Sequence, residues 1–467
     1  MVLTVEEKQR IAVLIAGFII LVIFYLLPNP EGLGTDGKMM IGILVLGIIL
    51  WVSEAIPLAI TGLLVIILQP ILYIAEPKHV FTAFGNTAVF FLIGAFIIAS
   101  AIEKHNLHKR IALLFLSKFE NSPKSFTLGI MLCCSFLSFI IPEHAVAVLM
   151  MPIVLSILVS LNVIPRLSNF GKVSMLAIAY GCSIGSLGTL IGGARNPVTI
   201  GFLETQDIQV SFLDWMIYSM PVVFISLPFI WLLLIHFYPL EIKDLKEVHI
   251  KLNKEIKSLG PATSEEKMVT YILIGTVIAW IFIPSIFSYI GLAVIAVSGG
   301  IVMFFSGSIT WKDIEQRVPW GIVLLYGGAI TLGIGMLETG AAEWLANNLL
   351  SISGDNPVIA IFLLILITVL FTNVMSNTAA VAMILPIGAG IALVLGFGSP
   401  LITSMIIALA GGLAFILVIA TPANAITYSA GYFSTKDLIR AGIIVNFICI
   451  LVLFIIAITY WRLIGLW

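Results

Sequence analysis

Charged side chains are scarce in this sequence. They make up only 10% of the 467 residues, whereas hydrophobic residues make up 60%. Soluble domains carry about 25% charged residues. The formal net charge is −1, so there is no strongly basic surface to recruit nucleic acid. This composition excludes an ordinary soluble domain and predicts an all-α protein that crosses the membrane many times.

Cysteine is also rare, and motifs that hold cofactors are missing. Cys133, Cys134, Cys182 and Cys449 all lie inside apolar stretches, so we expect no disulfides. The sequence has no HExxH, no Walker lysine loop and no GxGxxG after a strand. We therefore expect no resident cofactor and no enzymatic activity, and sodium is the one ion considered below.

Apolar runs long enough to span a bilayer recur along the chain, since a spanning helix needs about 20 residues. The first run has no small-residue cleavage site, so we predict a retained helix rather than a signal peptide. Two amphipathic stretches, 107–119 and 341–351, are predicted to lie in the membrane interface. About eleven transmembrane helices are predicted, at 10–28, 39–55, 57–73, 88–104, 174–203, 212–237, 268–288, 289–306, 319–340, 400–433 and 439–464.

Two further apolar regions, 126–162 and 357–397, are too long for one crossing. The first is interrupted by Pro142-Glu143-His144-Ala145 and the second by Ser376-Asn377-Thr378-Ala379. Each arm has roughly 15 to 20 residues, which fits a re-entrant hairpin that enters and leaves on the same side. Irregular backbone at that depth is tolerated only where it lines a cavity or is buried in protein.

The sequence repeats itself near its midpoint. The two tetrapeptides are 234 positions apart, and the same offset joins Pro57-Leu58-Ala59-Ile60 to Gly291-Leu292-Ala293-Val294. We predict a first repeat over 1–237, a polar cytoplasmic linker over 238–267 and a second repeat over 268–467. The first half has six predicted crossings and the second has five, so the repeated unit is taken as five crossings plus a hairpin in each half. This odd number inserts the two copies in opposite senses, as in secondary transporters with inverted repeats.

The distribution of Lys and Arg fixes the orientation. With the N-terminus inside and both hairpins re-entrant, 19 of the 23 basic residues fall on the inner side. Lys38, Lys78 and Arg462 fall outside, and Arg195 lies within a span. Because cytoplasmic loops carry the excess of Lys and Arg, we predict a multi-pass protein of the plasma (inner) membrane with a cytoplasmic N-terminus.

The breaks carry the only residues suited to bind a ligand. A half-helix that begins at mid-membrane presents free N–H groups and the positive end of its dipole, which suits an anion. Ser376, Asn377 and Thr378 add small neutral donors and acceptors that suit a carboxylate together with a monovalent cation. A second pair of breaks, Gly192–Pro197 and Ala420–Ala425, aligns Asn196 with Asn424 at an offset of 228.

Three motifs together resemble the divalent anion/sodium symporter family of INDY-type di- and tricarboxylate transporters. They are Trp51–Pro57, the Ser-Asn-Thr tip and Ala420–Ala425, and the resemblance covers nearly the whole chain. It implies a homodimer in which a scaffold domain holds the dimer and a transport domain moves as an elevator. It also implies a set of substrate contacts, at Ser376, Asn377, Thr378, Thr421 and Pro422. It implies a sodium site as well, at Thr372, Asn377 and Ala420.

The first half departs from this family pattern. Pro142-Glu143-His144 replaces Ser-Asn-Thr, and Arg195 stands where small residues or proline are usual. Ser138 and Gly192 still match the family's first sodium site, but its tip ligands are gone. Because buried charges are costly unless paired, we predict a Glu143–Arg195 ion pair in place of that sodium.

Several other roles remain open for these first-half residues. The ion pair could be purely structural, or Arg195 could instead hold a substrate carboxylate. His144 could hydrogen-bond substrate or carry a proton. The candidate substrate-binding set in the breaks therefore also includes Glu143, His144, Arg195, Asn196 and Asn424.

The function predicted is a carrier for C4–C5 dicarboxylates of the malate, succinate, fumarate or 2-oxoglutarate class. A fixed Arg195 charge keeps the site electropositive without sodium and penalises the return of the empty site, so we expect sodium-independent exchange. The alternatives are a sodium- or proton-coupled di- or tricarboxylate symporter, or a carrier of another anion such as citrate, sulfate or an arsenite-type oxyanion. An intramembrane enzyme using Glu143 and His144 is a distant alternative that lacks a nucleophile motif.

Overall fold

A computed structural model describes residues 5–287, 289–353 and 356–466, and this part of the chain is all helix and loop, without strands. Ten of its helices are long and apolar enough to cross a membrane. These ten include three hairpin helices, and four other apolar helices are shorter. Helix length alone therefore confirms an all-α membrane protein, and the division into eleven crossings and two hairpins stays a prediction.

The first half begins with helices that run back and forth before the first break. They are α1 (Val5–Leu26), α2 (Thr35–Ser53), α3 (Leu58–Ile71), α4 (Pro77–Thr82), the 3₁₀ turn Ala83–Gly85, α5 (Thr87–Lys104) and α6 (Leu107–Leu116). The first hairpin and the helices after it follow. They are α7 (Pro123–Leu137), α8 (Glu143–Ser160), α9 (Asn169–Gly185), α10 (Arg195–Glu204), α11 (Phe212–Phe237) and the linker helix α12 (Lys246–Leu259).

The second half has the same order of elements. It begins with α13 (Ser264–Ile286), α14 (Leu292–Phe305), α15 (Trp311–Arg317), α16 (Trp320–Glu338) and α17 (Ala341–Ser353). It continues with α18 (Pro357–Val374), α19 (Asn377–Val394), α20 (Leu401–Ala410), the 3₁₀ turn Val418–Ala420, α21 (Pro422–Ser429), α22 (Thr435–Ile458) and α23 (Tyr460–Leu463).

Helix bounds recur with the offset found in the sequence. Adding 234 to the bounds of α3 gives 292–305, the bounds of α14, and adding 234 to those of α8 gives 377–394, the bounds of α19. The short helices α4 and α6 correspond in the same way to α15 and α17. The two halves therefore share one pattern of α-helices, and α1, α12 and α23 lie outside it.

The structure corrects two spans. The stretches 174–203 and 400–433 are each divided by an unwound segment, 186–194 between α9 and α10 and 411–421 between α20 and α21. In the sequence we placed these breaks at Gly192–Pro197 and Ala420–Ala425, so the backbone leaves the helix six to nine residues earlier than predicted. The linker is also shorter, because α13 begins at Ser264.

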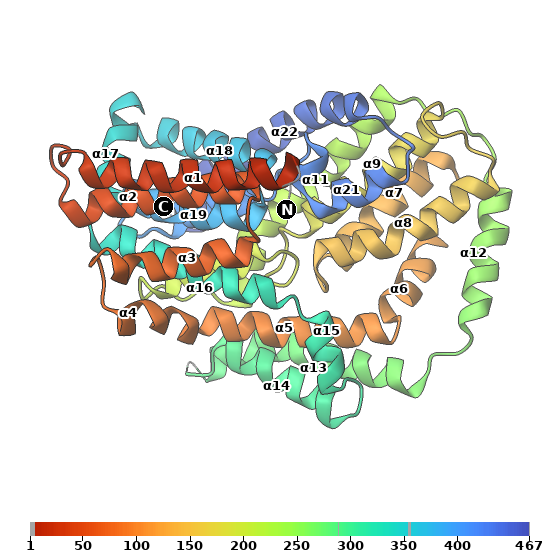
Figure 1. Cartoon of the computed structure of the whole chain (residues 1–467). Helices are drawn as coiled ribbons and strands as arrows, with labels where there is room; N and C mark the ends of the chain where they lie inside the picture. The colour runs from red at the N-terminus through yellow and green to blue at the C-terminus, as the bar shows by residue number, and fades with distance from the viewer. Residues whose placement is uncertain (1–4, 288, 354–355, 467) are drawn as a thin grey trace.

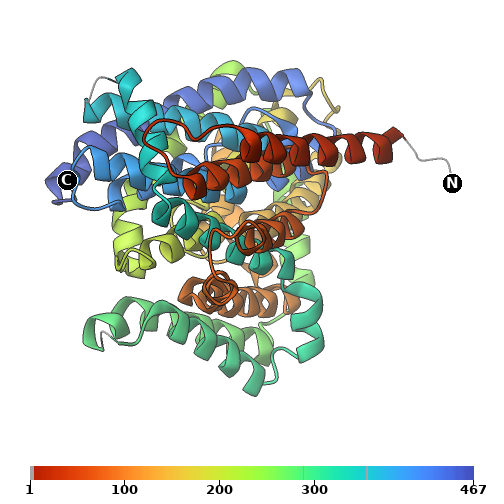
Figure 2. The same cartoon turned by 60° about the vertical axis from the view of Figure 1, so that its left-hand side comes forward.

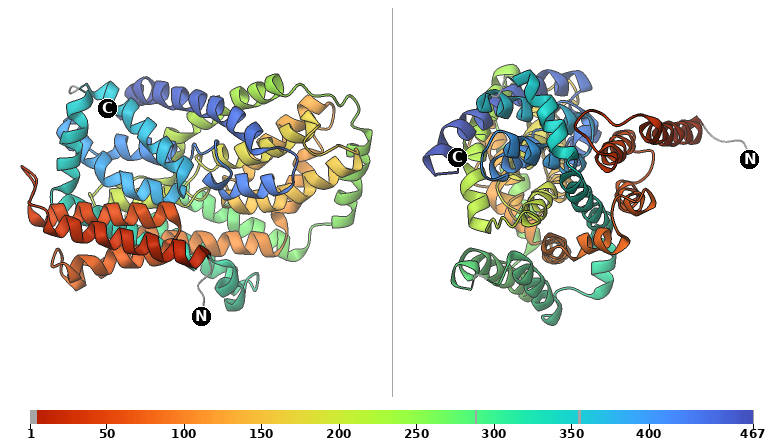
Figure 3. Two further views of the ribbon diagram at one scale, coloured as in Figure 1. Left: turned by 45° about the horizontal axis from the view of Figure 1, so that its top comes forward. Right: turned by 90° about the vertical axis from the view of Figure 1, so that its left-hand side faces the viewer.

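The helices form one body with a peripheral layer on each side. In Figure 1 most long helices run along a common direction, and α12 stands across that direction at the right-hand edge. Figure 2 shows α13 and α14 at one edge, and α18 and α22 at the opposite edge. Helix α1 lies on the outside against α2, and the N-terminal end of α1 projects from the body (Figure 3). The unwound segments 186–194 and 411–421 lie in the interior, where most of their residues are buried.

Close backbone contacts join two helices of the first half, α3 and α5, to two helices of the second half, α16 and α14. A Cβ added at Gly328 of α16 would lie 2.4 Å from Gly62 Cα of α3, and one at Gly94 of α5 would lie 2.4 Å from the carbonyl carbon of Ala296 in α14. The two contacts are related by the offset of 234, since it takes Gly62 to Ala296 and Gly94 to Gly328. Small residues let helix backbones approach in this way inside membranes.

Replacing Gly328 with alanine is expected to destabilise the protein. The new methyl group meets backbone, which cannot rotate away, so we expect a cost of about 1–3 kcal/mol. The measurement is the thermal unfolding midpoint of the purified protein in detergent. Gly275→Ala on α13 is the matched control, because nothing lies within 4 Å of its Cβ position. Equal midpoints for the two variants would contradict the proposed close approach.

Candidate functional site

The two hairpin tips and the two unwound segments line one cavity of about 350 Å³. Its other wall comes from the ends of α2, α3 and α16 and from Phe96 in the middle of α5. Ten of the fourteen predicted site residues line this cavity. They are Glu143, His144, Gly192, Arg195, Ser376, Asn377, Thr378, Ala420, Thr421 and Pro422.

Helix α19 presents its N-terminus to the cavity. Helix α18 ends at Val374, Met375 is extended, and α19 starts after Ser376, whose side chain does not cap it. The first backbone hydrogen bond back to Ser376 comes from Ala380, so the earlier N–H groups have no helical acceptor. Such a terminus at a polar cavity suits an anionic group.

A cluster of oxygen atoms lies beside this tip. Thr372 Oγ1 is 2.7 Å from Asn377 Oδ1 and 2.6 Å from the Gly411 carbonyl oxygen, and all three residues are buried. A hydroxyl has a single proton, so it can donate to only one of these two acceptors at a time. This places a hydroxyl, an amide and a backbone carbonyl oxygen together in the interior. Hard cations bind such oxygens, so these residues fit a sodium ion.

The corresponding place in the first half holds an ion pair instead. Ser138 and Glu143 stand at the positions of Thr372 and Asn377, and Ser138 Oγ is buried without a hydrogen-bond partner. Arg195 Nη1 lies 3.9 Å from Glu143 Oε1, which confirms the predicted pairing. Ser186 bridges the two charges, because its hydroxyl accepts from Arg195 Nη2 at 2.7 Å and lies 2.8 Å from Glu143 Oε2.

The Arg195 guanidinium lies between the two unwound segments. A Cβ added at Gly193 would be 2.6 Å from Nη1, and one added at Gly412 would be 2.4 Å from Nη2. Both glycines are therefore needed to make room for it. The side chain is 1% exposed, and its Nε has no hydrogen-bond partner. Arg195 thus joins the two halves and keeps donors that Glu143 does not use.

Asn196 and Asn424 lie behind the loops rather than on the cavity. Asn196 Nδ2 donates to the Ser186 and Thr189 carbonyl oxygens at 2.8 and 2.7 Å. Asn424 Nδ2 donates to the carbonyl oxygens of Ala414 and Leu417 at 3.0 Å, and these acceptors are related to the first pair by the offset of 228. The structure does not place either residue on the cavity and instead shows their side chains closing the unwound segments.

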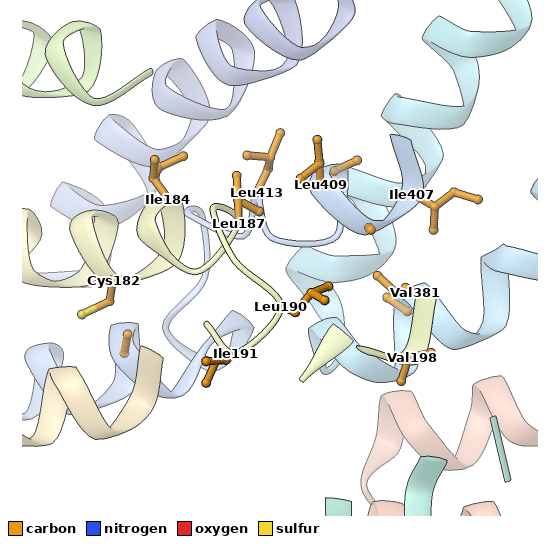
Figure 4. Packing of buried hydrophobic residues seen from close by; sticks show 14 of the residues in the cluster. Cys182, Ile184, Leu187, Leu190, Ile191, Val198, Val381, Ile407, Leu409 and Leu413 are labelled. Atoms are coloured by element: carbon orange, nitrogen blue, oxygen red, sulfur yellow. The ribbon is translucent and has the colours of Figure 1, made fainter. Parts of the chain in front are cut away.

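The unwound segments are embedded in apolar packing. Ile184 of α9 and Leu187 of the first unwound segment lie beside Leu409 of α20 and Leu413 of the second unwound segment (Figure 4), and all four are buried. Thr421 then caps α21, with its Oγ1 accepting from the Asn424 N–H at 3.1 Å. This packing holds polar backbone at fixed positions around the cavity.

Two residues at the site were not predicted. Ser186 bridges the ion pair. It opens the segment 186–194, in which Gly188, Gly192 and Gly193 were the available signal of a bend. Glu54 lines the cavity from the end of α2. Its membership of the Trp51–Pro57 motif was the available signal.

Comparison with known proteins gives consistent matches over the whole chain. The family described as the sodium:sulfate symporter transmembrane region matches residues 8–467. The sodium-dependent dicarboxylate transporter SdcS of Staphylococcus saprophyticus is 30% identical, with 95% of this chain and 90% of that protein covered. SdcS of Staphylococcus aureus strain USA300 is 31% identical, with 95% and 89% covered.

Two solved structures share the fold at low sequence identity. The MtrF antimetabolite efflux pump of Neisseria gonorrhoeae has a TM-score of 0.61, 13% identity and coverage of 97% of this chain and 94% of its own. The YdaH transporter of Alcanivorax borkumensis has a TM-score of 0.54, 13% identity and coverage of 98% of each chain. These similarities support the helical transporter architecture alone.

Proposed function

Because the chain belongs to the sodium:sulfate symporter transmembrane family, and is thus a multi-pass transporter rather than an enzyme, we propose that it carries C4–C5 dicarboxylates coupled to sodium. The observation that carries this proposal is the α19 tip, where free N–H groups and an oxygen cluster suited to a cation lie side by side. The SdcS relatives, which are sodium-dependent dicarboxylate transporters, support it.

In this proposal each end of the substrate meets a different half of the site. One carboxylate binds at the α19 N-terminus with the Ser376, Asn377 and Thr378 side chains, and Thr421 and Pro422 complete that side. The other carboxylate lies toward Arg195, which keeps unused donors, and toward His144. Sodium binds at Thr372, Asn377, Gly411 and Ala420, so a single coupling ion is expected because the first site holds Glu143 and Arg195.

Sodium-independent exchange is the second candidate, and Arg195 is the observation that favours it. The guanidinium lies at the place that the family resemblance assigns to a first sodium ion, and its Nε donor is not used by Glu143. The sequence led us to expect this mode, whereas the names of the relatives favour the sodium-coupled alternative. Proton coupling through His144 and transport of citrate, sulfate or another anion are less well supported by the relatives.

The wider setting of the proposal follows the sequence analysis. We propose a homodimer in the plasma membrane with a cytoplasmic N-terminus, two inverted repeats over 1–237 and 268–467, and elevator movement of the hairpins past a scaffold. The cavity wall at the ends of α2, α3 and α16 lies on the side that the Lys and Arg count places inside. The structure would then represent an inward-facing state.

Proteoliposomes test the substrate and the coupling together. Uptake of labelled succinate is measured with and without a sodium gradient, and with and without unlabelled succinate inside. We expect succinate uptake to require sodium. We expect citrate to inhibit this uptake only weakly. Uptake that needs internal dicarboxylate and ignores sodium would establish the exchanger instead. Absence of uptake with every C4–C5 dicarboxylate would overturn both candidates.

A further inference from the structure

Glu54 is a charged residue on a wall of the cavity that is otherwise apolar. The cavity residues contributed by α2, α3, α5 and α16 and their ends are Glu54, Leu58, Phe96, Ile322 and Leu325. Glu54 is exposed, and no ion pair or hydrogen bond of its side chain is found in the described part of the chain. Its carboxylate therefore faces the cavity without a compensating cation on its own side.

The backbone holds Glu54 in a fixed position. It ends α2 in the left-handed conformation, with φ 49° and ψ 28°, which non-glycine residues adopt at some cost. Trp51 is fully buried, and Ser53 Oγ donates to the Ile49 carbonyl oxygen at 2.6 Å. Because the turn is anchored on the preceding helix, the carboxylate cannot move far from the cavity mouth.

The charges around the cavity do not balance. The hairpin and unwound segments contribute the ion pair of Glu143 and Arg195, whose charges cancel. With Glu54 included, the residues around the cavity carry one net negative charge, which lies on the wall formed with α2, α3, α5 and α16. A bound dicarboxylate with one sodium ion also carries a net negative charge. The loaded site is therefore repelled by Glu54 for as long as it faces this wall.

We propose that Glu54 is a release residue, which lowers dicarboxylate affinity only while the hairpin tips face the ends of α2 and α3. The inference rests on the proposed function. When the hairpins and loops move away from this wall, the site keeps its own balanced charges and loses the repulsion. Affinity is then lower on the side where α2 ends than on the opposite side, which promotes unloading there.

Binding of succinate measured separately from each side tests this assignment. Proteoliposomes carry the protein in one orientation, established by protease cleavage in the exposed linker around α12. Glu54→Gln is expected to bind succinate roughly three- to tenfold more tightly than wild type from the α12 side, and equally from the other side. The difference should shrink as ionic strength rises, because salt screens exposed charges.

Two variants separate charge from structure. Glu54→Asp keeps the charge and should behave as wild type. Glu76→Gln removes an exposed carboxylate that does not line the cavity and should change nothing. A salt-independent change, an equal change on both sides, or no change in Glu54→Gln would overturn the assignment. If wild type binds no succinate from either side, the proposed function fails, and this inference fails with it.

Discussion

Replacing Asn377 with alanine is expected to reduce dicarboxylate transport by about 100-fold or more while the protein stays folded. Asn377 lies at the first position of α19, where its Oδ1 is 2.7 Å from Thr372 Oγ1 and its amide lines the cavity. Alanine removes an oxygen from the proposed cation site and a donor from the proposed carboxylate site at once. Loss of the cation ligand and loss of the carboxylate donor both weaken binding of the loaded state, so their effects on transport reinforce each other.

Initial uptake rates in proteoliposomes provide the measurement, with size-exclusion profiles to confirm folding. Asn446→Ala is the matched control. Asn446 is also a buried asparagine of the second half, but it lies on α22 away from the cavity, and its side-chain amide has no hydrogen-bond partner. Unchanged uptake kinetics in Asn377→Ala would show that the α19 tip is not the binding site.

Replacing Arg195 with leucine is expected to lower the free energy of unfolding by about 3–5 kcal/mol. The substitution leaves the Glu143 carboxylate buried beside Ser186 without its cation, and an uncompensated buried charge is costly. The double variant Glu143→Leu/Arg195→Leu should recover most of this loss, because it removes both charges together. Thermal unfolding in detergent gives the comparison.

Lys246→Leu serves as the control for loss of a cation. Lys246 pairs with Asp244 at 3.3 Å, but both side chains are mostly exposed, so little effect is expected. Transport by the double variant Glu143→Leu/Arg195→Leu then distinguishes a structural role of the ion pair from a role in substrate binding. Restored stability with normal transport would mean that the ion pair is only structural. Restored stability without transport would place the Arg195 guanidinium on the substrate.

The sequence predicts the features that depend on pattern and spacing. The offset of 234 appears first in tetrapeptides and again in the bounds of α3 and α14, because duplicated segments fold alike. The polar tips predict cavity residues because polar groups inside a membrane are tolerated only where they are satisfied. The Glu143–Arg195 pair follows from the cost of burying each charge alone.

The features that sequence could not give depend on tertiary contacts. The unwound segments start at Ser186 and Gly411 and stay largely buried, as an ordinary helix in this position would. What holds them open is a pair of amide side chains, Asn196 and Asn424, that bind carbonyl groups seven and ten residues earlier. No local propensity reports such bonds, so the breaks were placed too late.

The position of Arg195 has an electrical consequence. A charge attached to the protein returns with it on every cycle, so it adds nothing to the net charge moved, whereas a sodium ion in its place would. A dianion with one sodium ion therefore carries one negative charge per cycle. A membrane potential of 100 mV, negative inside, opposes that entry by about 2.3 kcal/mol. A tenfold sodium gradient supplies only about 1.4 kcal/mol. Across an energised membrane such a carrier would export dicarboxylate or exchange it, and it would not accumulate it.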